Sequence, residues 1–129
     1  MSVSEEVEEL IAGARVSAHL ATSVDDRPHV APVWYAYEDG VVSLVTGGKK
    51  LRNVRANPRV ALSIERADGP TVHWTATLLG TATVVEDRDR VERARERIFA
   101  KYDAADQAGE YGFQPLVRVT VRTATCEVF

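Results

Sequence analysis

Basic residues gather in residues 41–64, a segment that contains no aspartate or glutamate. These residues are Lys49, Lys50, Arg52, Arg55 and Arg59. Thr46, Gly47 and Gly48 precede the lysines, between an apolar strand pattern and a short helix pattern that must end near Pro58. A glycine turn at this point leaves backbone N–H groups unpaired at the start of the helix, where the helix dipole favours an anion. We therefore expect a phosphate site here. The alternative is a solvated basic helix that only joins two strands.

A second group of residues suited to ligand binding lies in residues 28–37, PHVAPVWYAY, which hold two prolines, one tryptophan and two tyrosines. Pro32 has no N–H to donate to a sheet, so we expect it at a sheet edge or at a break in the strand. A break beside Trp34 and Tyr35 would free backbone groups next to flat side chains. That combination suits an aromatic heterocycle that needs both hydrogen bonds and stacking. The alternative is that these aromatic residues belong to the core or to a subunit interface.

The three histidines show no metal-ligand spacing with another His, Cys or carboxylate, so we expect no metal site. His73 precedes Trp74 at the start of a long strand pattern and is the best candidate for a ligand contact. We expect His19 to be an interior residue on a strand face, and His29 to be exposed near a turn. The sequence contains no G-x-S-x-G element, P-loop or Rossmann glycine pattern, so it identifies no catalytic residue.

The composition is that of an ordinary globular protein and argues against several classes. A length of 129 residues suggests one domain, and a formal net charge of −3 argues against a general nucleic-acid binder. No apolar run approaches the ~20 residues of a membrane span, so we expect no membrane association. The single cysteine fits a reducing compartment, and the acidic N-terminus lacks an apolar signal core. We therefore expect a cytoplasmic protein.

Hydrophobic periodicity predicts several strands and two or three helices. The expected helices are an N-terminal one capped by Ser2 or Ser4, the basic one, and a third over residues 87–102. The expected strands cover residues 15–24, 28–37, 41–45, 60–66, 71–85 and 116–129, with a loop over residues 104–112. The first three strands read as an antiparallel meander, and Gly80 marks a bend or bulge in the longest strand. The whole set suggests a closed or nearly closed barrel.

The charges of the third helix alternate in sign, with Arg93, Arg95 and Arg97 between Glu92 and Glu96. Such a pattern is typical of a solvated face supported by neighbouring opposite charges. One of these arginines could line a substrate mouth, but the sequence does not indicate which.

Three segments, in this order, resemble the flavin-binding split-barrel family related to pyridoxamine 5'-phosphate oxidase. They are DDRPHVAPVWYAYEDG, TGGKKLRNVRANPRVALSI and HWTATLLGTATVV. The pattern T-x-x-K-K-x-x-N-x-x-x-N-P-R-V is the most specific, and the resemblance runs from about residue 18 to residue 102. It implies a mainly β fold, a six- to seven-stranded antiparallel split β-barrel with two or three helices. Residues 1–129 would form a single FMN-binding split-barrel domain.

The resemblance also implies a homodimer with FMN between the two subunits. The cofactor phosphate would be held by the residues at Thr46, Lys49, Lys50 and Asn53. The cofactor ring would rest against the strand at Pro32, Val33, Trp34 and Tyr35. His73 and Trp74 would reach the same site or the partner's cofactor.

The chemistry at this site is less defined than its position. The C-terminal segment VRVTVRTATCEVF lacks the Arg/His-rich ending with which pyridoxamine phosphate oxidases hold their vitamin substrate, so we do not expect that activity. Some branches of the family bind the deazaflavin F420 through the same basic corner. The expected function is an FMN-dependent oxidoreductase acting on an unknown small organic substrate. The alternatives are an F420-dependent reductase on the same fold and a non-catalytic flavin- or haem-binding protein.

Overall fold

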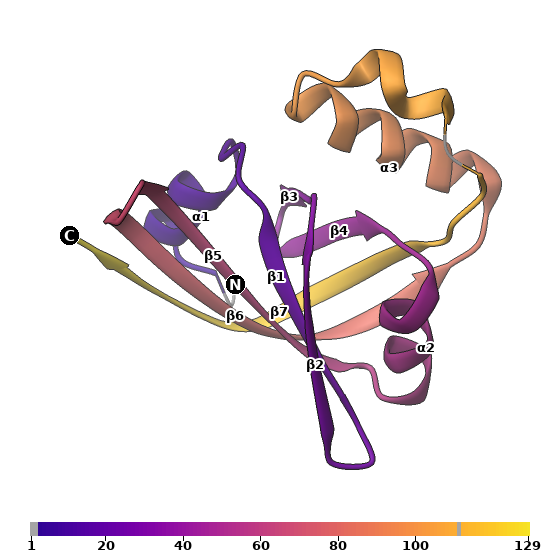
Figure 1. Cartoon of the computed structure of the whole chain (residues 1–129), viewed down its shortest axis with the longest axis horizontal. Helices are drawn as coiled ribbons and strands as arrows, with labels where there is room; N and C mark the ends of the chain where they lie inside the picture. Colours follow the sequence, from indigo (N-terminus) through magenta and orange to yellow (C-terminus); the bar gives the residue numbers. More distant parts are fainter. Residues whose placement is uncertain (1–2, 111) are drawn as a thin grey trace.

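The computed structural model describes residues 3–110 and 112–129 and shows a strongly curled sheet with helices packed around it (Figure 1). The elements in chain order are α1 (Glu5–Ile11), β1 (Ala18–Val24), β2 (Arg27–Val33), β3 (Ala36–Glu38), β4 (Val41–Val45), α2 (Gly48–Ala56), β5 (Arg59–Asp68), β6 (Thr71–Val85), α3 (Arg88–Lys101), the 3-10 helix η1 (Ala105–Glu110) and β7 (Leu116–Val128). The strand order is β2-β1-β5-β6-β7-β4-β3, and all neighbouring strands are antiparallel. Within the described ranges the sheet has seven strands and is not closed, which confirms the expected split barrel.

The second expected strand is broken, so the expected meander is present as two separate antiparallel hairpins, β1–β2 and β3–β4, rather than as three neighbouring strands. β2 ends at Val33 and β3 begins at Ala36, and these two strands form the opposite edges of the sheet. Pro32 therefore lies in an edge strand, where its missing N–H costs no ladder hydrogen bond. Only Trp34 and Tyr35 connect the two edges. The Cα atoms of Val33 and Ala36 are three Cα–Cα steps apart, so at this corner the two edges lie within about 11 Å of each other. This short connection requires the sheet to curl.

Alternation along the long strands builds the core as expected. Trp74, Ala76 and Leu78 of β6 are buried, and so are Val117, Val119 and Val121 of β7. The predicted irregularity at Gly80 is confirmed, because the β6–β7 register shifts between Leu79 and Gly80. A Cβ at Gly80 would lie 2.5 Å from the carbonyl oxygen of Thr120, so only glycine fits where these two strands cross so closely.

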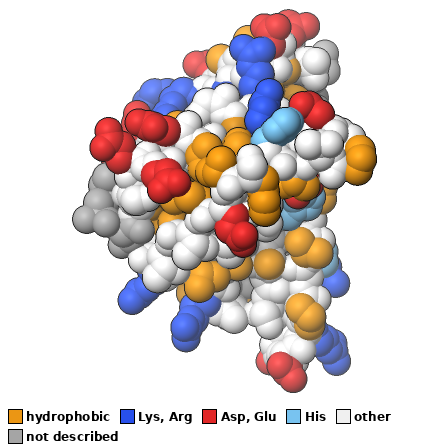
Figure 2. All heavy atoms as spheres, turned by 90° about the vertical axis from the view of Figure 1, so that its left-hand side faces the viewer, with side chains coloured by type: hydrophobic (Ala, Val, Ile, Leu, Met, Phe, Trp, Pro, Cys, Tyr) orange, Lys and Arg blue, Asp and Glu red, His pale blue; other side chains and the backbone are white. Residues whose placement is uncertain are grey.

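The outer face of the sheet carries one cross-strand row of small and apolar residues. The strand registers place Val30, Ala21, Ala61 and Leu79 in one cross-strand row over β2, β1, β5 and β6. Val30 and Leu79 are 63% and 50% exposed. Figure 2, which views the molecule from the left of Figure 1, shows hydrophobic and histidine side chains exposed between the charged ones.

The helices close the ends and the open side of the sheet. Ser4 caps α1 by accepting a hydrogen bond from the Val7 backbone, whereas Ser2 lies outside the described residues. The Tyr35 hydroxyl donates to the Ile11 carbonyl at 2.6 Å, which fixes α1 to the core. Residues 104–112 are not simply a loop, since η1 occupies part of them. In the described part of the chain, no helix has both the length and the apolar character needed to cross a membrane.

Candidate functional site

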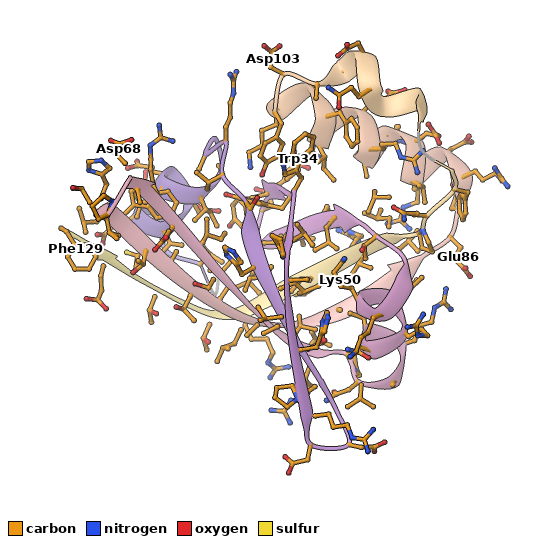
Figure 3. All side chains as sticks on the ribbon, viewed as in Figure 1. Trp34, Lys50, Asp68, Glu86, Asp103 and Phe129 are labelled. Carbon is orange, nitrogen blue, oxygen red and sulfur yellow. The ribbon has the colours of Figure 1, made fainter. Side chains whose placement is uncertain are left out.

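A cleft of about 250 Å³ opens where the end of β2, the β4–α2 junction and α3 meet. The expected residues that line it are Pro32, Val33, Trp34, Thr46 and Lys50. The structure thus brings together the two segments that the sequence singled out separately. Figure 3 shows Trp34 at the end of β2 beneath α3, and Lys50 at the start of α2.

The β4–α2 junction is suited to binding an anion. Gly47 is the N-cap of α2 and provides no side-chain hydrogen bond to the first amides of the helix. Gly48 has a positive φ of 63°, a conformation that glycine adopts without strain. The residues that line the cleft include two cations, Lys50 and Arg95, and no aspartate or glutamate. The electrostatic field in the cleft therefore favours a negatively charged group.

Aromatic rings of α3 and its C-cap hold the broken strand in place. The Trp34 indole stacks on the Tyr102 ring with centroids 4.5 Å apart and 3° between planes, and it meets Phe99 edge-on at 5.5 Å. Trp34 is nevertheless 39% exposed, and it lines the cleft. The cleft therefore has an aromatic wall in addition to its two cations.

The backbone groups of Tyr35 at the break are not free, contrary to the sequence expectation. The Tyr35 N–H donates to the Tyr102 hydroxyl at 3.3 Å, and that hydroxyl donates to the Val16 carbonyl at 2.8 Å. The Tyr35 carbonyl accepts from Lys101 Nζ at 3.1 Å. Lys101 Nζ also lies 3.4 Å from the centroid of the Tyr35 ring. Burial lowers the pKa of Lys101 to about 8, and burial raises the pKa of Tyr102.

Other expected site residues lie outside the cleft of this chain. Tyr35 is a core residue, and Lys49 is exposed on α2 without lining the cleft. The Asn53 amide donates to the Thr22 hydroxyl at 3.0 Å and thereby ties α2 to β1. The roles of these residues toward a cofactor stay predictions.

His73 and Trp74 lie near the opposite end of the molecule. His73 Nε2 is 2.7 Å from Asp68 Oδ2, and Figure 3 shows Asp68 on the side away from Lys50 and Glu86. Trp74 is buried in the core, while His73, its neighbour on β6, is exposed on the outer face. Within one chain these two residues do not contribute to the cleft.

Two expectations for the other histidines are wrong. His19 is exposed rather than interior, because it lies on the outer side of β1 between the inward-facing Ala18 and Leu20. His29 is half-buried, and its Nδ1 is buried without a hydrogen-bond partner among the described residues.

Arg95 is the main site residue that the sequence did not single out, although it is one of the three arginines of which one could line a substrate mouth. It is only 4% exposed, so the expected solvated face is wrong at this position. Its guanidinium donates to the Gly112 carbonyl at 3.1 Å and to Glu92 at 3.3 Å, and it lines the cleft with Phe99 and Gln114. Helical spacing could have found it, because positions 91, 95, 98 and 102 form one stripe.

Comparisons with known proteins agree with this fold. A family model described as pyridoxamine 5'-phosphate oxidase matches residues 4–128. No curated protein matches the chain significantly. A solved structure of a conserved hypothetical protein from Mycobacterium tuberculosis is 24% identical, with 98% of this chain and 85% of that chain covered and a TM-score of 0.82.

Two further solved structures are similar over almost their whole length. A FAD-binding protein from Mesorhizobium loti is 21% identical, with 96% of this chain and 94% of that chain covered and a TM-score of 0.75. A protein named F420 reductase is 26% identical, with 95% of this chain and 98% of that chain covered and a TM-score of 0.72. At 21% and 24% identity, the first two similarities described establish the fold alone.

Proposed function

The chain belongs to the pyridoxamine 5'-phosphate oxidase family, and from this premise we propose that it is an FMN-dependent oxidoreductase acting on a small organic substrate. One observation carries the proposal. A single cleft combines the uncapped start of α2, the cations Lys50 and Arg95, and the exposed indole of Trp34, without a carboxylate in its lining. A phosphorylated aromatic heterocycle matches that combination of charge and shape.

The chain's residues would bind and orient the cofactor. Lys50 and the first amides of α2 neutralise the phosphate, and Thr46 adds a hydroxyl at the same junction. The strand end at Pro32, Val33 and Trp34 supports the ring, while Phe99 and Ile98 of α3 keep water from one side. When bound, the cofactor supplies hydride transfer to or from the substrate.

We do not propose pyridoxamine 5'-phosphate oxidase activity for this chain, although the family model carries that description. Residues 117–129 contain two arginines and no histidine, and most of this segment is strand β7 inside the sheet. This segment therefore offers no Arg/His-rich stretch that could hold a vitamin substrate.

F420 is the second candidate cofactor. The similar protein named F420 reductase is 26% identical, and the match covers 95% of this chain. F420 also carries a phosphate and a flat deazaflavin ring, so the same cationic corner and aromatic wall suit it. A non-catalytic flavin or haem carrier remains the alternative from another functional class.

The absorbance spectrum of the protein purified after supply of each cofactor tests the proposal. We expect a flavin spectrum and release of FMN identified by mass spectrometry. A deazaflavin spectrum would favour F420, and a Soret band would favour a haem carrier. Reduction of the bound cofactor by NAD(P)H, followed by reoxidation by an added acceptor, distinguishes an enzyme from a carrier. A protein that takes up neither FMN nor F420 contradicts the proposal.

We further propose that the site is completed in a cytoplasmic homodimer. The cleft of one chain, about 250 Å³, lies below the roughly 300–1,000 Å³ typical of small-molecule sites. The outer row of Val30, Ala21, Ala61 and Leu79 offers an apolar face. Pro32 and His73 lie on the same outer side of the sheet, so a second copy there could approach the cleft. A dimer across this face would also bury His19.

Leu79→Glu tests the dimer proposal. A charge at the β6 end of the apolar row should shift the protein toward monomer, because an unpaired carboxylate is costly to bury in an interface. Sedimentation velocity at several protein concentrations measures the change. The matched control is Ala100→Glu, which adds the same charge at an exposed position of α3. A wild-type monomer at micromolar concentration, or a Leu79→Glu protein that dimerises like the control, contradicts the proposal.

A further inference from the structure

A second cavity, of about 360 Å³, lies between α3 and the strands β3, β4 and β7. It shares no lining residue with the cleft described above. Its polar lining consists of Arg90, Arg93 and Arg97 from α3, Arg118 from β7, Ser43 from β4 and Glu38 from β3. Four arginines, three from a helix and one from the sheet, therefore line one cavity.

The helix itself separates the two sites. Arg90, Arg93 and Arg97 recur at a spacing of three and four residues, which places them along one side of α3. Val91 and Ile98 are buried against the sheet and form the ridge between the two sides. Arg95 and Phe99 lie on the other side and line the cofactor cleft. The arginine cavity is thus a distinct site.

The positive charge in this cavity is only partly compensated by the protein. Arg97 lies 3.5 Å from Glu38, the one carboxylate in the lining. In the described part of the chain, Arg90, Arg93 and Arg118 form no ion pair. Like charges three or four residues apart destabilise a helix. Because the whole chain has a formal charge of −3, this cluster is not a consequence of general basicity.

We propose that this cavity binds a small polyanion, a molecule with at least two phosphate or carboxylate groups. Guanidinium groups bind both kinds of oxyanion through paired N–H donors, and arginines on two elements allow two such groups to be held at once. The Ser43 hydroxyl supplies a further donor at the sheet side. The volume lies within the range of small-molecule sites, which favours a small anion over a chain segment of a macromolecule.

NMR titration of the 15N-labelled protein tests the proposal without depending on the cofactor. Pyrophosphate and citrate serve as the phosphate and carboxylate probes, and acetate is the monoanion control. We expect saturable shifts of the amides of Val41, Ser43 and Arg118 with at least one of the two probes. The affinity for acetate, measured from the same amide shifts, should be at least tenfold weaker, since acetate occupies only part of the arginine set.

The variant Arg90→Gln/Arg93→Gln removes two charges from an exposed helix side and should still fold. We expect its affinity for the bound probe to fall at least tenfold, as the loss of a charged hydrogen bond implies. The control Arg66→Gln/Arg122→Gln removes the same charge at exposed positions outside both cavities and should bind as the wild type does.

Three outcomes would overturn the proposal: shifts confined to residues 47–50, shifts equal for acetate and the polyanions, or equal affinity in the two double variants. A failure of FMN binding leaves this result unaffected, because none of the three observed amides belongs to a residue that lines the cofactor cleft.

Discussion

Lys50→Ala will weaken FMN binding roughly tenfold to a hundredfold while leaving the fold intact. Lys50 is the lysine of α2 that lines the cleft, at the uncapped start of the helix. A hydrogen bond to a charged group contributes about 1.5–3 kcal/mol, which corresponds to that change in Kd. Fluorescence titration with FMN measures the effect, and circular dichroism checks that the variant is folded.

Arg52→Ala is the matched control for this prediction. Arg52 carries the same charge on the same helix, but it is exposed and does not line the cleft. Its removal should change the FMN affinity by less than about threefold, since exposed charges interact weakly through solvent. The FMN affinity of Lys49→Ala should lie between those of Lys50→Ala and Arg52→Ala, because Lys49 is adjacent to Lys50 in sequence but exposed. If Lys50→Ala binds FMN as tightly as Arg52→Ala does, the phosphate does not lie at the start of α2.

Gly80→Ala will destabilise the protein by about 3 kcal/mol, within the upper range for forced overpacking. The added Cβ would lie 2.5 Å from the Thr120 carbonyl oxygen and 2.8 Å from Val119 Cγ1. Neither neighbour can yield freely, since one is backbone in the centre of the sheet and the other is a buried side chain. A loss of this size lowers the melting temperature by roughly 10 °C for a chain of this length.

Gly13→Ala tests whether the destabilisation by Gly80→Ala comes from the close contact of the added Cβ rather than from the loss of a glycine. A Cβ at Gly13 would meet no atom within 4 Å. Its substitution should be neutral or slightly stabilising, because alanine restricts the unfolded chain. Thermal denaturation of the two variants side by side gives the comparison. Equal melting temperatures would mean that β6 and β7 can separate at the register shift without cost.

The two proposed sites both depend on the position of α3. On one side, Tyr102 and Lys101 bind the backbone of Tyr35 and fix the corner where Trp34 enters the cleft. On the other side, Arg90 and Arg93 face the polyanion cavity. A helix that was displaced from the sheet would disturb the aromatic wall and the arginine set together.

Local patterns in the sequence determined much of this protein. Strand alternation predicted the buried side of β6 and β7, and the lack of a Cβ at Gly80 predicted the irregularity there. Turn and proline chemistry located α2, and the missing N–H of Pro32 predicted an edge position. These features could be predicted because each depends on neighbours in the chain and on the periods of strand and helix.

Other features were decided only by the tertiary structure. The sequence predicts β2 and β3 as one strand, but in the structure they lie at opposite edges of the sheet. They separate because the sheet curls around a shared core, which is a long-range effect that no local pattern encodes. Arg95 and Glu92 look alike as helix charges, yet the packing of α3 buries the arginine and leaves Glu92 exposed. Contacts between residues as distant as Tyr35 and Lys101 likewise position the cleft. The sequence determined which residues could bind a phosphate and a ring, and the curling of the sheet decided which of them line one cleft.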